Sequence, residues 1–452
     1  MKKFDVIVVG AGTAGCMAAK TIASAGFSVC LIDRKEREDI GNKVCGDAIG
    51  KHHFDKLNLA YPKGDELERE IHRVDVHSPD METTFSIKGE GLDGFMIDRH
   101  LFGQRLLKDA SDDGALLEDS THVLEPVVKE GFVRGVYARD LKSGRKIEFA
   151  ARCAVDASGV AAVMRSKLPP EMDVETEVGK KDLMVCYREI RMLKGMAREP
   201  DICDIYFDLE AAPGGYCWIF PKAGQKVNVG LGIVGSVRSV NPKEQFHKYV
   251  LSRPLFEGSS VIHGGGGVVP TRKPLESMVT NGAVIVGDAG CHVNPIHGGG
   301  MGSSMIAGMI SGETLIEGLE KDDLSADSLW PANARYMQLY GAKQAGLDIF
   351  RIFLQGLNND DLNYGMMYRL IREEDILKTT LGEAIHLNVT EKTRRIFRGI
   401  GRLTFLRKLY NMVELSRKIK TLYRNYPSTP KEFPDWKANV QALYETARTQ
   451  LG

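Results

Sequence analysis

Two short apolar runs flank a helical stretch at the start of the chain. Residues 4–9 are FDVIVV and residues 28–33 are SVCLID, and continuous runs rich in Val and Ile are typical of strands covered on both faces. The stretch between them, CMAAKTIASAG at 16–26, is rich in small residues and ends at a glycine. This order of strand, helix and strand predicts a βαβ unit in an α/β fold.

Later patterns predict more strands and a helical end. Residues 152–160 and 282–288 each contain an apolar run that leads into a small-residue turn, as at the end of a buried strand. Short alternating runs such as KVNVGLGI at 226–233 predict an antiparallel sheet. From about residue 331, apolar residues recur three and four positions apart, as in 333–357, which predicts helices.

These patterns divide the chain into three units, and the fold class expected is α/β, or α+β overall. We expect a Rossmann-like domain from residues 1–60, 95–165 and 275–330, an inserted antiparallel-sheet domain from 61–94 and 166–274, and a helical part from 331–452.

A glycine-rich turn follows the first predicted strand and gives the βαβ unit a ligand. Gly10 permits a tight turn, Gly12 lets a pyrophosphate approach the backbone, and Gly15 allows the helix to pack closely on the strand. Ala14 lies inside the same turn, and the free N–H groups of the helix start favour phosphate. Asp33 ends the second strand, where its carboxylate can accept hydrogen bonds from an adenosine ribose.

The stretch at 282–312 decides which dinucleotide is expected. Gly287-Asp288 at a strand end, followed by Pro295 and a glycine-rich turn, resembles the second fingerprint of FAD enzymes of the aromatic hydroxylase type. The resemblance implies that Asp288 binds the ribityl chain and that the helix beginning near Gly300 points its amino end at the flavin. Gly299 and Met301 are placed in the same contact. A helix amino terminus stabilises the negative charge of reduced flavin.

Two further segments match the same fold type. Residues 96–110 predict a helix with Arg99 on its first turn, at the position of a family arginine that contacts the cofactor. Residues 121–128, THVLEPVV, resemble the strand beside the adenine, which places Val123 near that ring.

The segment 213–233 carries a more specific resemblance. Tyr216-x-Trp218-x-Phe220-Pro221, followed by Gly230-x-Gly232, is similar to the characteristic motif of the geranylgeranyl reductase family. The motifs that share this resemblance are KVCGDAI at 43–49, VPTRKPL at 269–275 and NPIHGGGMGSSM at 294–305. The remainder of the chain looks like the long carboxy-terminal part of archaeal members that saturate the geranylgeranyl chains of membrane ether lipids.

The resemblance implies an FAD enzyme that reduces isolated C=C bonds in C20 prenyl chains. Substrate contacts are expected from Tyr216, Trp218, Pro295 and His297, whereas Phe220 is expected in the core. An unactivated alkene needs a hydride from reduced flavin and a proton from the site. The candidate acids are Cys45, His297 and Tyr216, and the segment with Cys45 and Gly46 is expected to pass close to the flavin ring. His292 is given no role.

Composition narrows the partners and the compartment. Lys plus Arg and Asp plus Glu number 60 each, so nothing attracts nucleic acid to the chain as a whole. Eight scattered cysteines without zinc spacing predict free thiols, a reducing cytoplasm and no metal site. No apolar run reaches the ~18 residues of a membrane span. The basic amphipathic stretch at 394–426 would allow peripheral contact with the inner face of the membrane.

Two other functions remain open at this stage, because a shared fold does not fix the chemistry. One is a flavin monooxygenase acting on a small aromatic or apolar substrate. The other is a flavoprotein that binds prenyl lipid without turnover. The electron donor, either NADPH or a ferredoxin, and the oligomeric state are also open.

Overall fold

The largest sheet of the molecule has eight strands and confirms the α/β class. The computed structural model describes residues 2–89, 91–195, 199, 201–237, 239–381 and 402–452. The main path of the sheet runs in the order β17 (Val279–Thr280), β18 (Ala283–Ile285), β11 (Lys146–Asp156), β1 (Lys2–Val9), β2 (Val29–Ile32) and β8 (Leu116–Glu118). Strands β9 (Thr121–Lys129) and β10 (Phe132–Asp140) continue it antiparallel from β11.

Strand β1 shows why its sequence is apolar at every position. Neighbouring side chains point to opposite faces of a sheet. Val6 and Val8 pack into the core that holds helices α1 (Thr13–Ser24), α3 (Arg99–Asp112) and α5 (Met301–Glu320). Ile7 and Val9 pack into a second core with residues of β9 and β10. Parallel pairing of β1 with β2 and β11 brings their carboxyl ends to one edge of the sheet, which is where ligands bind in such folds.

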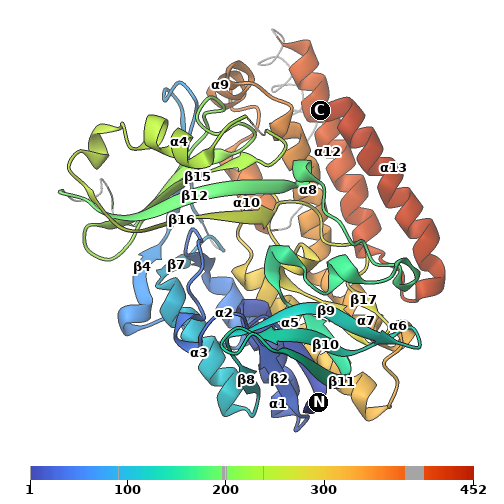
Figure 1. Ribbon diagram of the computed structural model, residues 1–452. Helices are drawn as coiled ribbons and strands as arrows, with labels where there is room; N and C mark the ends of the chain where they lie inside the picture. The colour runs from blue at the N-terminus through green and yellow to red at the C-terminus, as the bar shows by residue number, and fades with distance from the viewer. Residues whose placement is uncertain (1, 90, 196–198, 200, 238, 382–401) are drawn as a thin grey trace.

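A second sheet of seven strands lies above the first in Figure 1. Its order is β16 (Ser260–Pro270), β12 (Leu183–Met192), β15 (Lys226–Val234), β14 (Tyr216–Pro221), β13 (Ile202–Tyr206), β5 (Arg73–His77) and β6 (Thr84–Ile87). All its pairs are antiparallel except β13 with β5. The expected antiparallel insertion therefore includes one parallel pair, because β5 comes from a separate part of the chain.

A small sheet connects the two large ones. Strand β3 (Ala48–Gly50) pairs with β7 (Gly94–Ile97), which pairs with β4 (Leu67–Ile71). Strand β3 leads directly into helix α2 (Lys51–Leu57). Strand β3 therefore fixes the carboxyl end of the segment that contains Cys45.

The end of the chain is helical and packs along one side of both sheets (Figure 1). Its helices in the described part are α7 (Pro331–Tyr336), α8 (Ala342–Gln355), α9 (Asn359–Met367), α10 (Glu373–Leu381), α12 (Leu403–Arg424) and α13 (Phe433–Leu451), preceded by the short α4 (Pro242–Gln245) and α6 (Ala326–Leu329). Helix α12 packs against α8 and α13 with Met412, Leu415 and Ile419 buried.

Helix α12 covers most of the stretch expected to touch a membrane; residues 394–401 lie outside the described part. The buried apolar stripe of α12 serves the core, so peripheral membrane contact stays a prediction. No helix of the described residues has the length and apolar character needed to cross a bilayer.

Candidate active site

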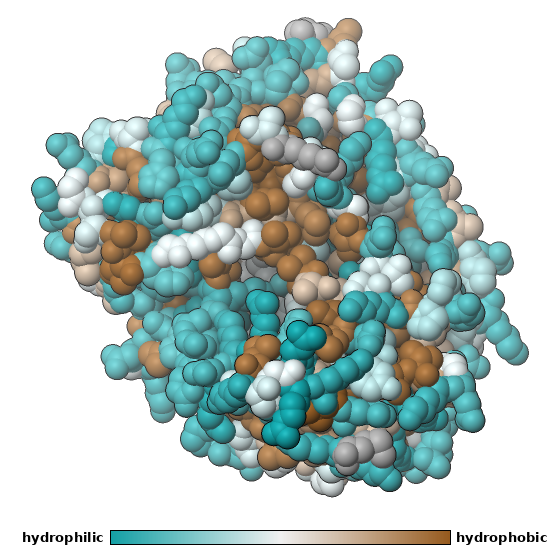
Figure 2. All heavy atoms as spheres, in the orientation of Figure 1, coloured by the Kyte–Doolittle hydropathy of each residue, from teal (hydrophilic) through white to brown (hydrophobic). Residues whose placement is uncertain are grey.

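A cavity of about 420 Å³ lies between the two large sheets and reaches the helical part of the chain. Figure 2 shows apolar side chains gathered where this face of the molecule is hollowed. The walls of the cavity come from the turn after β2, the segment at 42–46, strands β12, β14, β15 and β16, the turn at 295–300, and helices α8 and α9. Ligand sites of small molecules have this size and apolar lining.

The glycine-rich turn at the end of β1 leaves open space where a ligand would approach. Gly10 has φ +101°, and a Cβ there would lie 2.4 Å from the Ala157 carbonyl oxygen. Gly12 is different, because its backbone is extended, with φ −79°, and no protein atom lies within 4 Å of a Cβ built on it. Tight packing therefore requires glycine at position 10, whereas a methyl group at position 12 would extend into open space.

Asp33 holds this turn against the end of β2. Its Oδ2 accepts a hydrogen bond from the Ala11 N–H at 2.8 Å, and its Oδ1 accepts from the Lys35 N–H at 2.9 Å. A carboxylate has about four acceptor positions, so Asp33 keeps capacity for a ribose hydroxyl.

Arg99 lines the cavity and lacks a partner for part of its guanidinium. The residue is buried, and its Nε and Nη1 atoms have no hydrogen-bond partner among the described residues. An unpaired buried guanidinium is costly unless a ligand satisfies it. Helix α5 adds a second unsatisfied group, since its N-cap Gly300 provides no side-chain acceptor for the first N–H groups.

The features around Gly12, Arg99 and the start of α5 fit FAD, with its pyrophosphate and its flavin. Asp288 lines the same cavity and forms an ion pair with Lys43. The Lys43 Nζ atom lies 2.7 Å from Asp288 Oδ2. Lys43 belongs to the segment that carries Cys45, so this pair joins that segment to the turn after β18.

An aromatic wall faces the same cavity from the seven-stranded sheet. Tyr216, Trp218 and Phe220 alternate along β14 and line the cavity together. Phe220 was expected in the core, but it is half-buried and belongs to the lining. Gly230 lies directly opposite Trp218 on β15. Glycine leaves room for the Trp218 ring there, because a Cβ at position 230 would lie 2.6 Å from that ring.

Cys45 lies in the lining of the same cavity. Its thiol sulfur accepts a hydrogen bond from the Asp47 N–H at 3.4 Å. Its carbonyl oxygen accepts from Asn228 Nδ2 at 2.8 Å and from Arg188 Nε at 3.1 Å. The side chain is half-buried, so the thiol is placed in the cavity wall with a tightly held backbone.

The other two candidate acids lie together at the turn after β18. The Tyr216 hydroxyl donates to the His297 carbonyl oxygen at 2.7 Å, and burial raises the pKa of this phenol. His297 Nδ1 accepts from the Gly299 N–H at 3.1 Å. His297 is exposed to the open cavity, and desolvation by the surrounding protein, with Lys343 adding repulsion, lowers its pKa to about 4. A neutral His297 therefore carries its proton on Nε2 at neutral pH.

The structure brings some predicted residues into the cavity and leaves others behind it. The predicted residues in the lining are Cys45, Gly46, Arg99, Tyr216, Trp218, Asp288, Pro295, His297, Gly300 and Met301. Those outside it are Gly10, Gly12, Ala14, Gly15, Asp33, Val123 and Gly299. Val123 is buried in the core with Cys30 and Ile32 of β2, Gly10, Gly12, Ala14 and Gly15 belong to the turn after β1 and the start of α1, which Asp33 holds, and Gly299 belongs to the turn before α5.

Several lining residues had no sequence signal. Met184 and Cys186 come from β12, Phe207 follows β13, and Leu354 and Leu362 come from α8 and α9. Only the alternation of 184 and 186 along one strand could have placed the first two on a common face. The helical residues reach the cavity through tertiary packing alone.

His292 is fully buried beneath the Asp288 turn. Its ionisation therefore affects how the free energy of unfolding depends on pH. Its Nδ1 accepts from the Gly287 N–H at 3.2 Å, and desolvation lowers its pKa from 6.5 to about 3. The unfolded chain binds this proton near pH 6.5 and the folded chain only near pH 3, so stability falls as pH falls through that window.

We expect His292→Asn to flatten the acid side of the stability profile. The variant keeps an acceptor but cannot ionise, so the slope between pH 6 and 4 should decrease by about 1.4 kcal/mol per pH unit. Urea unfolding at several pH values measures the two slopes. Equal slopes for the variant and the wild type would contradict a buried neutral His292.

Comparison with known proteins agrees with this geometry. The family model described as geranylgeranyl reductase catalytic domain matches residues 182–269, and that of glucose inhibited division protein A matches residues 5–165. A digeranylgeranylglycerophospholipid reductase of Sulfolobus acidocaldarius is 42% identical over 97% of this chain and 96% of its own. One of Methanothrix thermoacetophila is 31% identical, over 83% and 93%.

Solved structures share the fold at low identity. A geranylgeranyl bacteriochlorophyll reductase-like protein of Thermoplasma acidophilum has a TM-score of 0.77 at 20% identity and covers 91% of this chain and 100% of its own. A myxobacterial FAD-dependent halogenase has a TM-score of 0.63 at 15% identity, covering 94% and 97%.

The fold and the site define a class, the FAD-dependent oxidoreductases. Within this class, the identity to relatives over nearly the whole chain is decisive. The chain belongs to the digeranylgeranylglycerophospholipid reductase family, and the resemblance carried by residues 213–233 is thereby confirmed.

Proposed function

We propose that this protein reduces isolated C=C bonds in the geranylgeranyl chains of membrane ether-lipid precursors. The observation that carries the proposal is one continuous cavity that is lined both by Arg99 and Asp288 and by the aromatic wall and apolar residues of α8 and α9. A prenyl chain can therefore lie against the flavin without leaving the protein. The names of the relatives support the same substrate class.

The chain's own residues divide the work. Gly10, Gly12, Ala14, Gly15 and Asp33 hold the adenosine and pyrophosphate part of FAD, with Arg99 donating to the cofactor. The residues toward the ribityl chain and the flavin are Asp288, Gly299, Gly300, Met301, Cys45 and Gly46. We place Val123 near the adenine by the family resemblance, although it is buried behind β2.

Reduced FAD supplies the hydride when it is bound. Tyr216 and Trp218 hold the alkene, with Pro295 and His297 at the turn opposite. Their apolar surroundings exclude water, which would trap a developing tertiary cation. The proton comes from a group in the wall, and Cys45 is the candidate best placed by its partly exposed thiol.

A dithionite-reduced enzyme tests this proposal without any choice of electron donor. The FAD-loaded protein is incubated anaerobically with geranylgeranyl diphosphate, with a digeranylgeranylglycerol phospholipid, and with a quinone that has a prenyl side chain. Mass spectrometry counts the hydrogen pairs added to each. We expect addition to the ether phospholipid; reoxidation of the flavin without added hydrogen in any substrate would contradict the proposal.

A further inference from the structure

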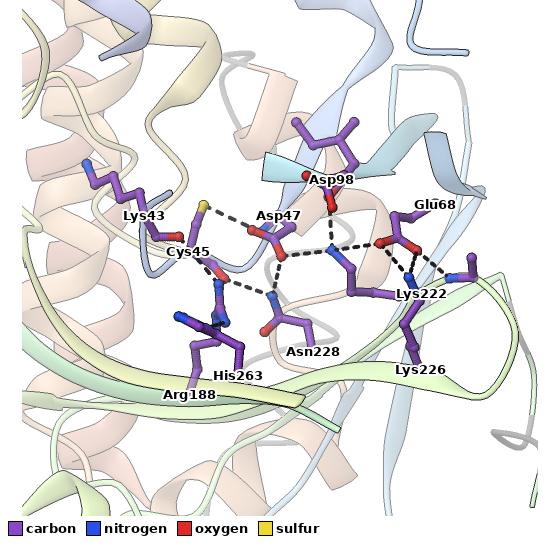
Figure 3. Close-up of polar contacts among 12 residues, drawn as sticks. Lys43, Cys45, Asp47, Glu68, Asp98, Arg188, Lys222, Lys226, Asn228 and His263 are labelled. Carbon is purple, nitrogen blue, oxygen red and sulfur yellow. Dashed lines mark hydrogen bonds and ion pairs between the residues drawn. The ribbon is translucent and has the colours of Figure 1, made fainter. Parts of the chain in front are cut away.

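The thiol segment, defined as Lys43–Asp47, is held from the sheet side by buried polar side chains. Figure 3 shows that Arg188 of β12 and Asn228 of β15 reach the segment, and that Lys222 joins Asp47 to Glu68 of β4. The alkene chemistry does not use these buried polar side chains directly, so we ask which part of the site they hold in place.

Asn228 is the centre of this network. It is fully buried on β15. Its Oδ1 accepts a hydrogen bond from Trp218 Nε1 at 3.0 Å. Its Nδ2 donates to the Cys45 carbonyl oxygen and to Asp47 Oδ2, both at 2.8 Å.

The partners of Asn228 determine which way its amide points. An indole N–H can only donate, so the amide oxygen must face Trp218. The two N–H groups then face two acceptors, the Cys45 carbonyl oxygen and the Asp47 carboxylate two residues further on. One side chain thus joins the aromatic wall to the backbone of Cys45 and to Asp47, with both amide hydrogens in use.

Asp47 shows that the segment needs this support. It is 2% exposed and has φ +63°, a left-handed conformation that residues other than glycine adopt at a cost. Lys222, itself 4% exposed, donates from Nζ to Asp47 Oδ2 at 3.0 Å and to the Ile97 carbonyl oxygen at 3.0 Å. Lys222 thus anchors the strained Asp47 to Ile97 of β7.

Charge in the network is compensated around Lys222. Glu68 lies 3.5 Å from Lys222 and 2.9 Å from Lys226, so two carboxylates face two ammonium groups. Breaking a buried pair by removing one partner is strongly destabilising. The surroundings of Asn228 therefore cannot easily rearrange to replace its hydrogen bonds.

We propose that Asn228 is a positioning residue that fixes the Cys45 thiol relative to Trp218, and so relative to the alkene that Trp218 contacts. The consequence for turnover rests on the proposed function, whereas the effect on the thiol does not. Asn228 touches no reacting atom; it acts through the Cys45 carbonyl group, Asp47 and the Trp218 ring.

Asn228→Asp is the sharpest test because it keeps size and shape. The substitution replaces the two donors by an acceptor, which then faces the Cys45 carbonyl oxygen and the Asp47 carboxylate. Asn333→Asp is the matched control, since Asn333 is also fully buried and bonds to Ser277 and Met278 away from the cavity lining. Asn228→Ala, which removes the bonds without adding charge, serves if Asn228→Asp does not fold.

Two readouts separate positioning from general stability. The first is the rate at which iodoacetamide alkylates Cys45 in FAD-loaded protein, followed by peptide mass spectrometry. We expect this rate to change about tenfold in the Asn228 variant, because the thiol segment is released. The second is the kcat for alkene reduction, which we expect to fall on the order of 100-fold with KM changed far less, as for a misplaced reacting group. Asn333→Asp should move neither.

A folded, FAD-loaded Asn228 variant whose Cys45 reacts at the wild-type rate overturns the proposal, whatever its turnover. If the wild-type protein reduces no prenyl substrate, the proposed function fails, but the alkylation rates still decide whether Asn228 positions the thiol.

Discussion

Gly12→Ala is expected to lower the affinity for FAD on the order of 100-fold, or about 2.7 kcal/mol, while the apo-protein unfolds as before. Position 12 has an extended backbone that alanine can adopt, and a Cβ there meets no protein atom within 4 Å. Only a pyrophosphate that approaches this backbone would collide with the new methyl group.

Gly179→Ala is the matched control for this experiment. Gly179 also precedes a helical turn with an extended backbone, and a Cβ there also meets nothing within 4 Å, but neither of its chain neighbours lines the cavity, whereas Thr13, next to Gly12, does. Fluorescence titration of apo-protein with FAD, together with thermal unfolding of the apo form, measures both variants. Wild-type FAD affinity of a folded Gly12→Ala protein would show that the pyrophosphate does not pass this turn.

Cys45→Ala is expected to reduce the kcat for alkene reduction by about 10² to 10⁴, the contribution of a positioned general acid. The alanine side chain removes the thiol proton and the acceptor of the Asp47 N–H, but the hydrogen bonds from Asn228 and Arg188 end on the Cys45 carbonyl oxygen and continue to hold the segment. FAD binding should therefore survive. Single-turnover reduction by dithionite-reduced enzyme measures the chemical step.

The control is Cys186→Ala, which removes the other partly exposed thiol of the same cavity. Its turnover is expected to stay within a few-fold of the wild type. Full alkene reduction by FAD-loaded Cys45→Ala would exclude the thiol as proton donor and leave His297 and Tyr216. Burial raises the pKa of Tyr216, and His297 is neutral at neutral pH because its pKa is lowered to about 4, so both are weak proton donors there.

The cofactor turn was predictable because its requirements are local. A glycine at position 10, open space at position 12 and a carboxylate at position 33 follow from one strand, one helix and one more strand within about thirty residues. The same holds for the alternation of Tyr216, Trp218 and Phe220, since period two fixes a common face of β14.

The surroundings of Phe220 and of the Val123 side chain depend on contacts that local patterns do not specify. Phe220 belongs to the cavity lining because the glycine-containing segment at 41–47 packs on it; a Cβ at Gly46 would lie 3.3 Å from its ring. Val123 is buried because β9 folds over the face of the sheet that holds Ile7 and Val9. Both outcomes depend on contacts between segments far apart in the sequence.

The sequence by itself determined the class of fold, the FAD turn and the family, because each rests on residue spacing within a single strand–turn–helix unit or a single strand. Only the tertiary structure decided that Asn228, Asp47 and Lys222 support the thiol segment, and that α8 and α9 close the apolar end of the cavity. These arrangements join residues up to about 180 positions apart. Their physical cause is the burial of polar groups that must find partners wherever the fold brings them, and no local pattern of residues specifies those partners.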